Sequence, residues 1–141
     1  MNSGSALIFL PVVVQVLLTM GVFVTLAVAK GRALKSGEVD ETRRAVYEDA
    51  WPEDVIRINN NIRNQFQLPV LFYVLVIVLW LLDAAGAFVQ LVAWLFVLSR
   101  AVHVYIHLSS NYVPYRRKAF MFGAVMIVVM ACVALLAILA G

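Results

Sequence analysis

Four polar side chains interrupt an otherwise apolar stretch of the sequence at helical spacing. They are three, four and four residues apart: Arg100, His103, His107 and Asn111. On a helix they fall within about 80° of one another. An arginine in a membrane span costs about 2.5–3.5 kcal/mol on insertion scales, and such residues normally face a protein interior or a wet cavity. The pattern predicts a basic helix face that is suited to binding an anion.

A second polar stripe lies ahead of another apolar segment. It consists of one arginine and four amides: Arg57, Asn60, Asn61, Asn64 and Gln67. These residues fall within an arc of about 120° on a helix. Pro52, which acids precede and follow, predicts the start of this helix. We expect the two stripes to face one polar pocket near the cytoplasmic surface.

The amino-acid composition indicates what kind of elements carry the two polar stripes. Of the 141 residues 64% are hydrophobic and 13% are charged, whereas soluble domains have about 45–50% apolar and about 25% charged residues. A water-soluble globule is excluded. Four apolar runs predict spans over residues 6–29, 66–82, 84–104 and 119–141. The expected fold is an all-α membrane protein, a single bundle of four transmembrane helices.

The distribution of charge predicts the topology. Lys and Arg gather in a loop over residues 30–51 and in residues 108–118, while the connection after the second span carries Asp83 and no base. Under the positive-inside rule both loops are cytoplasmic and both termini lie outside. The bases therefore act as topology signals at membrane edges, and no nucleic-acid partner is expected.

Structural roles remain open for several of these groups. Arg57, Arg63 and residues 116–118 lie near enough to a membrane edge to snorkel. Arg100 with His103 would also serve to cap a neighbouring helix or to pair with a carboxylate. No acid or cysteine joins His103 and His107 on their face, so no metal site is expected.

Together these motifs resemble the MAPEG superfamily, membrane-associated proteins in eicosanoid and glutathione metabolism. The first motif is the segment Asn61-x-x-Asn64-Gln65-Phe66-Gln67-Leu68-Pro69. The second is Arg100-x-x-His103, with Arg116 thirteen residues after the histidine. The similarity covers all four spans and looks like a bacterial branch, which places the protein in a bacterial inner membrane.

The resemblance implies a left-handed bundle assembled as a homotrimer, with pockets between protomers that hold glutathione. Arg116 matches the arginine that favours the thiolate. The expected glutathione-binding residues are Arg32, Arg57, Asn61, Asn64, Gln65, Arg100, His103 and His107. The sequence departs from the enzymes at four places, one of which is Arg117, which stands where some members have a polar residue after the arginine that favours the thiolate. An amide, Gln65 or Gln67, replaces the glutamate that binds the tripeptide's amine, and His107 and Phe120 replace tyrosines.

The chemistry of a bound thiol is compatible with one arginine. A thiol with a pKa near 8.5 needs about 2.7 kcal/mol to lower that pKa by two units, and a guanidinium at about 4 Å offers roughly 4 kcal/mol before desolvation. The first hypothesis is a glutathione-dependent transferase or peroxidase acting on hydrophobic electrophiles or lipid hydroperoxides from the bilayer. The alternative is a non-catalytic lipid-binding or partner-activating protein. A channel is less favoured, because the polar stripes stop near one face.

Overall fold

The chain folds into long antiparallel helices. The computed structural model describes residues 6–140, and these contain helices and turns but no strand. The elements are α2 (Phe9–Ser36), the short 3-10 helix η1 (Glu48–Ala50), α3 (Glu53–Gln65), α4 (Leu68–Leu81), α5 (Ala87–Leu108) and α6 (Val113–Ala140). Four stretches are long and apolar enough to cross a membrane. The predicted all-α membrane fold with four spans is confirmed.

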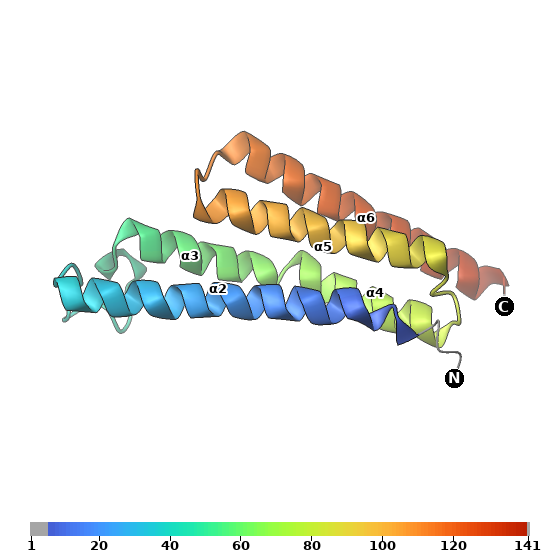
Figure 1. Cartoon of the computed structure of the whole chain (residues 1–141), viewed down its shortest axis with the longest axis horizontal. Coiled ribbons are helices and arrows are strands. Elements are labelled where there is room, and N and C mark those ends of the chain that lie inside the picture. The colour runs from blue at the N-terminus through green and yellow to red at the C-terminus, as the bar shows by residue number, and fades with distance from the viewer. Residues whose placement is uncertain (1–5, 141) are drawn as a thin grey trace.

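The four helical spans lie along one another, and the start of α2 and the end of α6 are at the same end of the bundle (Figure 1). The loop between α2 and α3 and the turn between α5 and α6 are at the opposite end. There α2 and α3 extend well beyond α5 and α6. The part of α3 that carries the polar stripe is therefore flanked by the ends of α5 and α6.

Several helix ends differ from the predicted spans, as at the third span, where α5 runs over Ala87–Leu108. The first helix continues to Ser36 and ends at Gly37, whose φ of 72° lies in the left-handed region that glycine adopts without strain. The fourth helix begins at Val113, because Pro114 fits the first turn of a helix, where its missing N–H is not needed. The predicted loop over 30–51 is correspondingly shorter at its start. The last residue of the predicted fourth span, 141, lies outside the described residues.

The second span is a broken helix. Pro69 lacks the N–H that would donate to the carbonyl of Gln65, so the helical ladder is interrupted between α3 and α4. Together the two helices form one span of 29 residues, Glu53–Leu81. The predicted span from residue 66 therefore corresponds to α4, and α3 extends it toward the loop.

The most buried of the four spans is α5, and it organises the core. Phe96 of α5 stacks on Phe72 of α4, with ring centroids 4.5 Å apart. On its other side α5 approaches α6 closely, because Gly123 presents no side chain toward Ser99 and Phe96. This packing holds the polar face of α5 in a fixed orientation toward α3.

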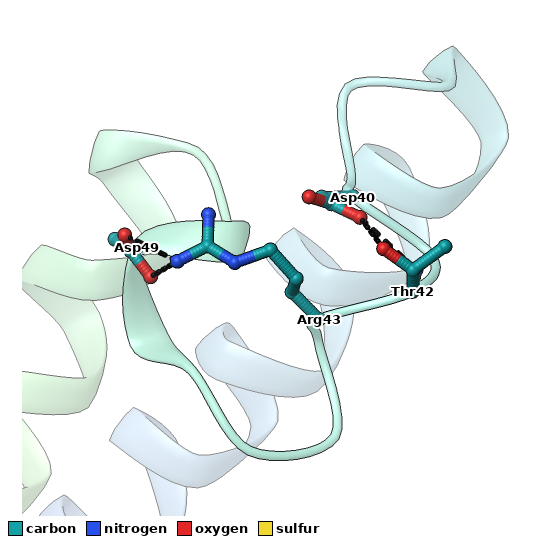
Figure 2. Close-up of polar contacts among 4 residues, drawn as sticks. All are labelled: Asp40, Thr42, Arg43 and Asp49. Atoms are coloured by element: carbon teal, nitrogen blue, oxygen red, sulfur yellow. Dashed lines mark hydrogen bonds and ion pairs between the residues drawn. The ribbon is translucent and has the colours of Figure 1, made fainter.

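Ion pairs and hydrogen bonds between its own residues stabilise the loop between α2 and α3. Figure 2 shows Arg43 reaching Asp49, with Nη2 2.8 and 3.0 Å from the two carboxylate oxygens, and Thr42 Oγ1 donating to Asp40 over 2.6 Å. The hydrogen bond from Thr42 lowers the pKa of Asp40, and the hydrogen bond to Asp49 raises the pKa of Arg43. Arg63 of α3 pairs with Glu48. Acids therefore match much of the positive charge in this region.

Candidate functional site

A polar hollow lies between α3, the end of α5 and the start of α6. It comprises two cavities of about 510 and 270 Å³, which share Asn64, Gln67 and Arg116 in their walls. The larger cavity is lined by Glu53, Ile56, Arg57, Asn60, Arg63, Asn64, Gln67, His107, Asn111 and Arg116. The smaller cavity is lined by Asn64, Gln67, His103, Val113, Arg116, Arg117 and Phe120. We call the two together the polar hollow.

One face of α3 forms a wall of the hollow. Arg57, Asn60 and Asn64 line it from α3, and Gln67 follows at the break before α4. Their spacings of three, four and three keep these residues on one side of a helix. Because the opposite wall includes His107 and Asn111, the structure brings residues of the two predicted stripes together around one cavity.

Asn61 and Gln65 turn away from the hollow toward α2. Gln65 Nε2 donates to Asn61 Oδ1 over 2.8 Å, and Gln15 Nε2 of α2 donates to Gln65 Oε1 over 3.1 Å. All three side chains are fully buried. The predicted stripe on α3 therefore divides. Four of its five residues line the hollow, whereas Asn61 turns away and bonds to Gln65, a residue outside the stripe that faces α2.

The basic residues of α5 lie at increasing depth. His107 lines the larger cavity and His103 the smaller one. Arg100 is completely buried behind them, where Nη2 donates to the carbonyl of Asn64 over 3.3 Å. In the described chain Arg100 Nε and Nη1 and the Nδ1 atoms of both histidines have no hydrogen-bond partner. Because buried polar atoms normally have partners, the Nδ1 atoms of the two histidines are available to a ligand or to water in the cavities. Arg100, although predicted to bind the ligand, lines neither cavity.

Arg116 stands where the two cavities meet. It lies in the first turn of α6, and its Nη1 donates to Asn111 Oδ1 over 2.6 Å. Asn111 has a φ of 51°, a left-handed conformation that asparagine tolerates better than most residues, and its backbone N–H donates to the carbonyl of Ile106 over 2.7 Å. The turn between α5 and α6 thus orients the guanidinium of Arg116 in the hollow.

The hollow carries an excess of positive charge. Its walls include Arg57, Arg63, Arg116 and Arg117 but a single acid, Glu53. The charge of Arg63 is matched by Glu48 outside the cavity. The remaining arginines make the hollow suited to an anion that also carries one positive group.

Of the other predicted site residues, Arg32 shares a cavity only with Arg57. It lines a separate cavity of about 370 Å³ on the α2 side of α3, together with Asp54 and Arg57. Arg57 lies at the boundary, because it lines both this cavity and the polar hollow. Within one chain Arg32 therefore lies outside the hollow that contains Arg116.

Sequence reasoning missed Glu53 and Gln15. Glu53 lies four residues before Arg57, so the spacing 53, 57, 60, 64 and 67 extends the same face of α3 and signals its place. Gln15 is a polar residue inside a long apolar span, which is a signal of a buried hydrogen bond between helices. For Arg63 the pattern gave no cavity signal, since its position at a membrane edge indicated snorkelling.

Comparison with known proteins agrees with this architecture. A sequence model of the MAPEG family matches residues 8–136 of the chain. No curated protein and no solved structure matches it. The matched region includes the first three helical spans, the fourth span up to residue 136 and every residue that lines the polar hollow. The chain, with its four apolar helical spans, therefore belongs to the MAPEG family of membrane proteins.

Proposed function

We propose that the protein is a membrane-embedded, glutathione-dependent transferase or peroxidase that acts on hydrophobic electrophiles or lipid hydroperoxides. The observation that carries this proposal is the position of Arg116 between two adjoining, arginine-rich cavities. One cavity provides room for an anionic peptide and the other provides room for its reaction partner.

The larger cavity has the size and charge for glutathione. Small-molecule sites in proteins occupy about 300–1,000 Å³, and this cavity has about 510 Å³. Glutathione carries two carboxylates and one ammonium group. Arg57 and the amides Asn60 and Asn64 provide donors for the carboxylates, and arginine is well suited to bind them in a bidentate manner. Glu53 provides the acceptor for the ammonium group, a role that the amides Gln65 and Gln67 would fill poorly.

Arg116 would stabilise the thiolate form of the bound thiol. Its guanidinium is held by Asn111 and reaches both cavities, so it favours the negative charge on sulfur. In a transferase reaction the thiolate sulfur forms a bond to the electrophilic carbon, and the leaving group departs with its electron pair. With a hydroperoxide, the thiolate sulfur attacks the terminal oxygen and the O–O bond breaks, which gives a sulfenic acid and an alkoxide. The alkoxide takes up the proton that the thiol lost on ionisation and becomes an alcohol. A second glutathione then forms the disulfide and releases water.

The smaller cavity is suited to the apolar reactant. Phe120 and Val113 contribute apolar walls beside Arg116 and His103. Val113 is 55% exposed, so this cavity borders an outer surface of the chain. A hydrophobic substrate would enter here from the lipid bilayer.

The proposal includes assembly as a homotrimer in a bacterial inner membrane. It rests on membership of the family and on the many large apolar side chains that the outer faces of α2 and α6 expose. In a trimer these faces would contact membrane lipids and neighbouring subunits. Chemical crosslinking in membranes tests it, with a ladder that ends at three copies as the expected result.

Ultraviolet difference absorbance on adding glutathione to purified protein tests the catalytic proposal. We expect a thiolate signal with the wild type and its loss in Arg116→Ala. Lys118→Ala is the matched control, because Lys118 is a basic residue of the same helix turn that lines neither cavity. A wild type without signal, or a signal that survives Arg116→Ala, would count against the enzyme.

The alternative is a non-catalytic lipid-binding or partner-activating protein. It is favoured by Phe120 and His107, which provide no phenol hydroxyl at the two positions where the related enzymes have tyrosines. Glutathione conjugation and hydroperoxide reduction by purified protein separate the two functions. Binding of a lipid with neither activity would support the alternative.

A further inference from the structure

A second cavity lies outside the polar hollow, between α2, α3 and the last residue of α5. It measures about 370 Å³ and changes character along its length. One end is walled by Val24 and Val28 of α2, and the other end carries Arg32, Asp54 and Arg57. We call this cavity the α2–α3 groove.

The apolar end of the groove lies at the depth of the membrane span. Val24, Val28 and Arg32 are four residues apart, so they follow one face of α2 over about 12 Å. Val24 and Val28 are 62% and 57% exposed, whereas Ala29 and Ile58 form a buried part of the groove. The first charges of α2 follow directly after Ala29, so the groove runs from hydrocarbon depth to the level of the lipid headgroups.

The charged end of the groove contains side chains without ionic partners. Within the described residues Arg32 makes no hydrogen bond and no ion pair. Arg57 makes one long hydrogen bond, from Nη1 to the carbonyl of Ser109 at 3.5 Å, and its buried Nε has no partner. The Asp54 carboxylate accepts from the backbone N–H of Val55 and pairs with neither arginine.

This arrangement differs from that of Arg43 and Arg44 in the neighbouring loop and of Arg63 in α3, which are all paired with acids. Two guanidinium groups and one carboxylate line the same groove without neutralising one another. Their charges are complementary to a headgroup that combines a phosphate with a primary ammonium group.

We propose that the α2–α3 groove binds a phospholipid of the phosphatidylethanolamine class. Arg32 and Arg57 bind the phosphate, Asp54 binds the ammonium group, and an acyl chain lies along Val24 and Val28. The bilayer is the source of the ligand, because the apolar half of the groove lies at the depth of the acyl chains. This lipid site shares Arg57 with the proposed thiol site, but Arg32 and Asp54 line only the groove, and Arg116 lines only the polar hollow.

Native mass spectrometry of the detergent-solubilised full chain tests the proposal. The probes are palmitoyl-oleoyl phosphatidylethanolamine and the corresponding phosphatidylglycerol, offered together. We expect the wild type to retain the ethanolamine lipid preferentially and Arg32→Gln to weaken its retention about tenfold, as the loss of one charge-assisted hydrogen-bond partner predicts. Asp54→Asn should shift the preference toward phosphatidylglycerol, because the acceptor for the ammonium group is removed.

Two variants serve as controls. Lys35→Gln removes a base three residues beyond Arg32 that does not line the groove, so lipid retention should be unchanged. Arg116→Gln should abolish the thiolate signal and leave lipid retention unchanged, which separates this proposal from the catalytic one. Circular dichroism and a single elution peak establish that each variant is folded.

Three results would overturn the proposal. The first is equal retention of both lipids by the wild type, and the second is a lipid preference that Arg32→Gln and Asp54→Asn both leave unaltered. The third is an equally strong adduct with glycerophosphoethanolamine, which has no acyl chains and cannot use the wall formed by Val24 and Val28. If oligomer formation responds to Arg32→Gln while no lipid is retained, the groove instead contacts a second copy of the chain.

Discussion

Gln15, Gln65 and Asn61 form a continuous chain of hydrogen bonds inside the bundle. The bonds Gln15–Gln65 and Gln65–Asn61 each join two fully buried side-chain amides. Thr19 Oγ1 in addition donates to the backbone carbonyl of Gln15 over 3.0 Å. Lipid offers no substitute partner for these groups, so an amide that loses its neighbour stays unsatisfied. The chain of amides therefore fixes the position of α3 against α2.

Replacement of the central amide should destabilise the protein. Gln65→Leu leaves both Gln15 Nε2 and Asn61 Oδ1 without a partner, and each such group costs about 1–3 kcal/mol. Unfolding by sodium dodecyl sulfate in mixed micelles measures the loss. The double variant Gln15→Leu/Gln65→Leu should recover part of it, because both ends of one hydrogen bond are then removed. Equal stability of Gln65→Leu and wild type would contradict this role.

Arg100 should matter more for ligand binding than for stability. It is completely buried, and two of its three guanidinium-group nitrogens have no partner in the described chain. Removing such a charge in favour of an apolar side chain is often neutral or stabilising. Arg100→Met should therefore change the unfolding free energy by no more than about 1 kcal/mol.

The same variant should weaken the thiolate signal, because Arg100 holds the carbonyl of Asn64, whose residue lines both cavities. Arg100 thus acts as a positioning residue. A glutathione titration of Arg100→Met with an unchanged affinity and an unchanged signal would show that its role is purely structural.

At the scale of elements, the contact between α5 and α6 depends on a residue without a side chain. A Cβ atom at Gly123 would lie 2.8 Å from Ser99 Oγ, and the phenyl ring of Phe96 lies at 3.7 Å. Ser99 Oγ already donates to the carbonyl of Phe96 over 2.6 Å, so it has little freedom to move. The two helices approach one another closely only while position 123 remains glycine.

Gly123→Ala should lower the unfolding free energy by about 1–3 kcal/mol, the usual cost of overpacking. Ser99→Ala in the same chain should restore much of the loss, since it removes the clashing oxygen. Gly21→Ala is the control, because nothing lies within 4 Å of a Cβ there and alanine favours helix by up to about 1 kcal/mol. Thermal unfolding in detergent measures all three, and equal effects of the two glycine replacements would contradict the packing argument.

At the scale of the whole molecule, the direction of insertion follows from the charge distribution. The loop between α2 and α3 and the turn between α5 and α6 share one end of the bundle, and the connection between α4 and α5 shares the other end with the start of α2 and the end of α6 (Figure 1). The bases gather at the first end. The positive-inside rule predicts that this end is cytoplasmic.

Labelling of single cysteines from the two sides of the membrane checks the orientation. Cys132 is the sole cysteine, so Cys132→Ser provides a background without thiols. In that background Val46→Cys and Ser110→Cys should react with a membrane-impermeant maleimide from the cytoplasmic side only. Asp83→Cys should react from the outside. The reverse pattern would contradict the predicted topology.

Much of this architecture is determined by local sequence. Runs of apolar residues specify four spans, because about 20 such residues cross the hydrocarbon layer. Spacing within one helix specifies which residues share a face, so the polar rows containing Arg57 and Asn64 on α3 and His103 and His107 on α5 follow from periodicity. The sequence also indicated that α3 starts near Pro52, although it placed the membrane end of this span only from residue 66 onward.

Only the packing of the helices determines which neighbouring helix or cavity each helix face contacts. Asn61 lies next to Asn60 in sequence, yet Asn61 accepts from Gln65, the partner of Gln15 in α2, while Asn60 lines the hollow. Arg32 enters a different groove from Arg116, and Glu53 joins the hollow. The physical reason is that contacts between helices depend on their rotation and tilt about one another. The rotation and tilt are set by contacts between residues far apart in the sequence, such as Gly123 against Ser99. The spacing of residues along a single helix does not predict them.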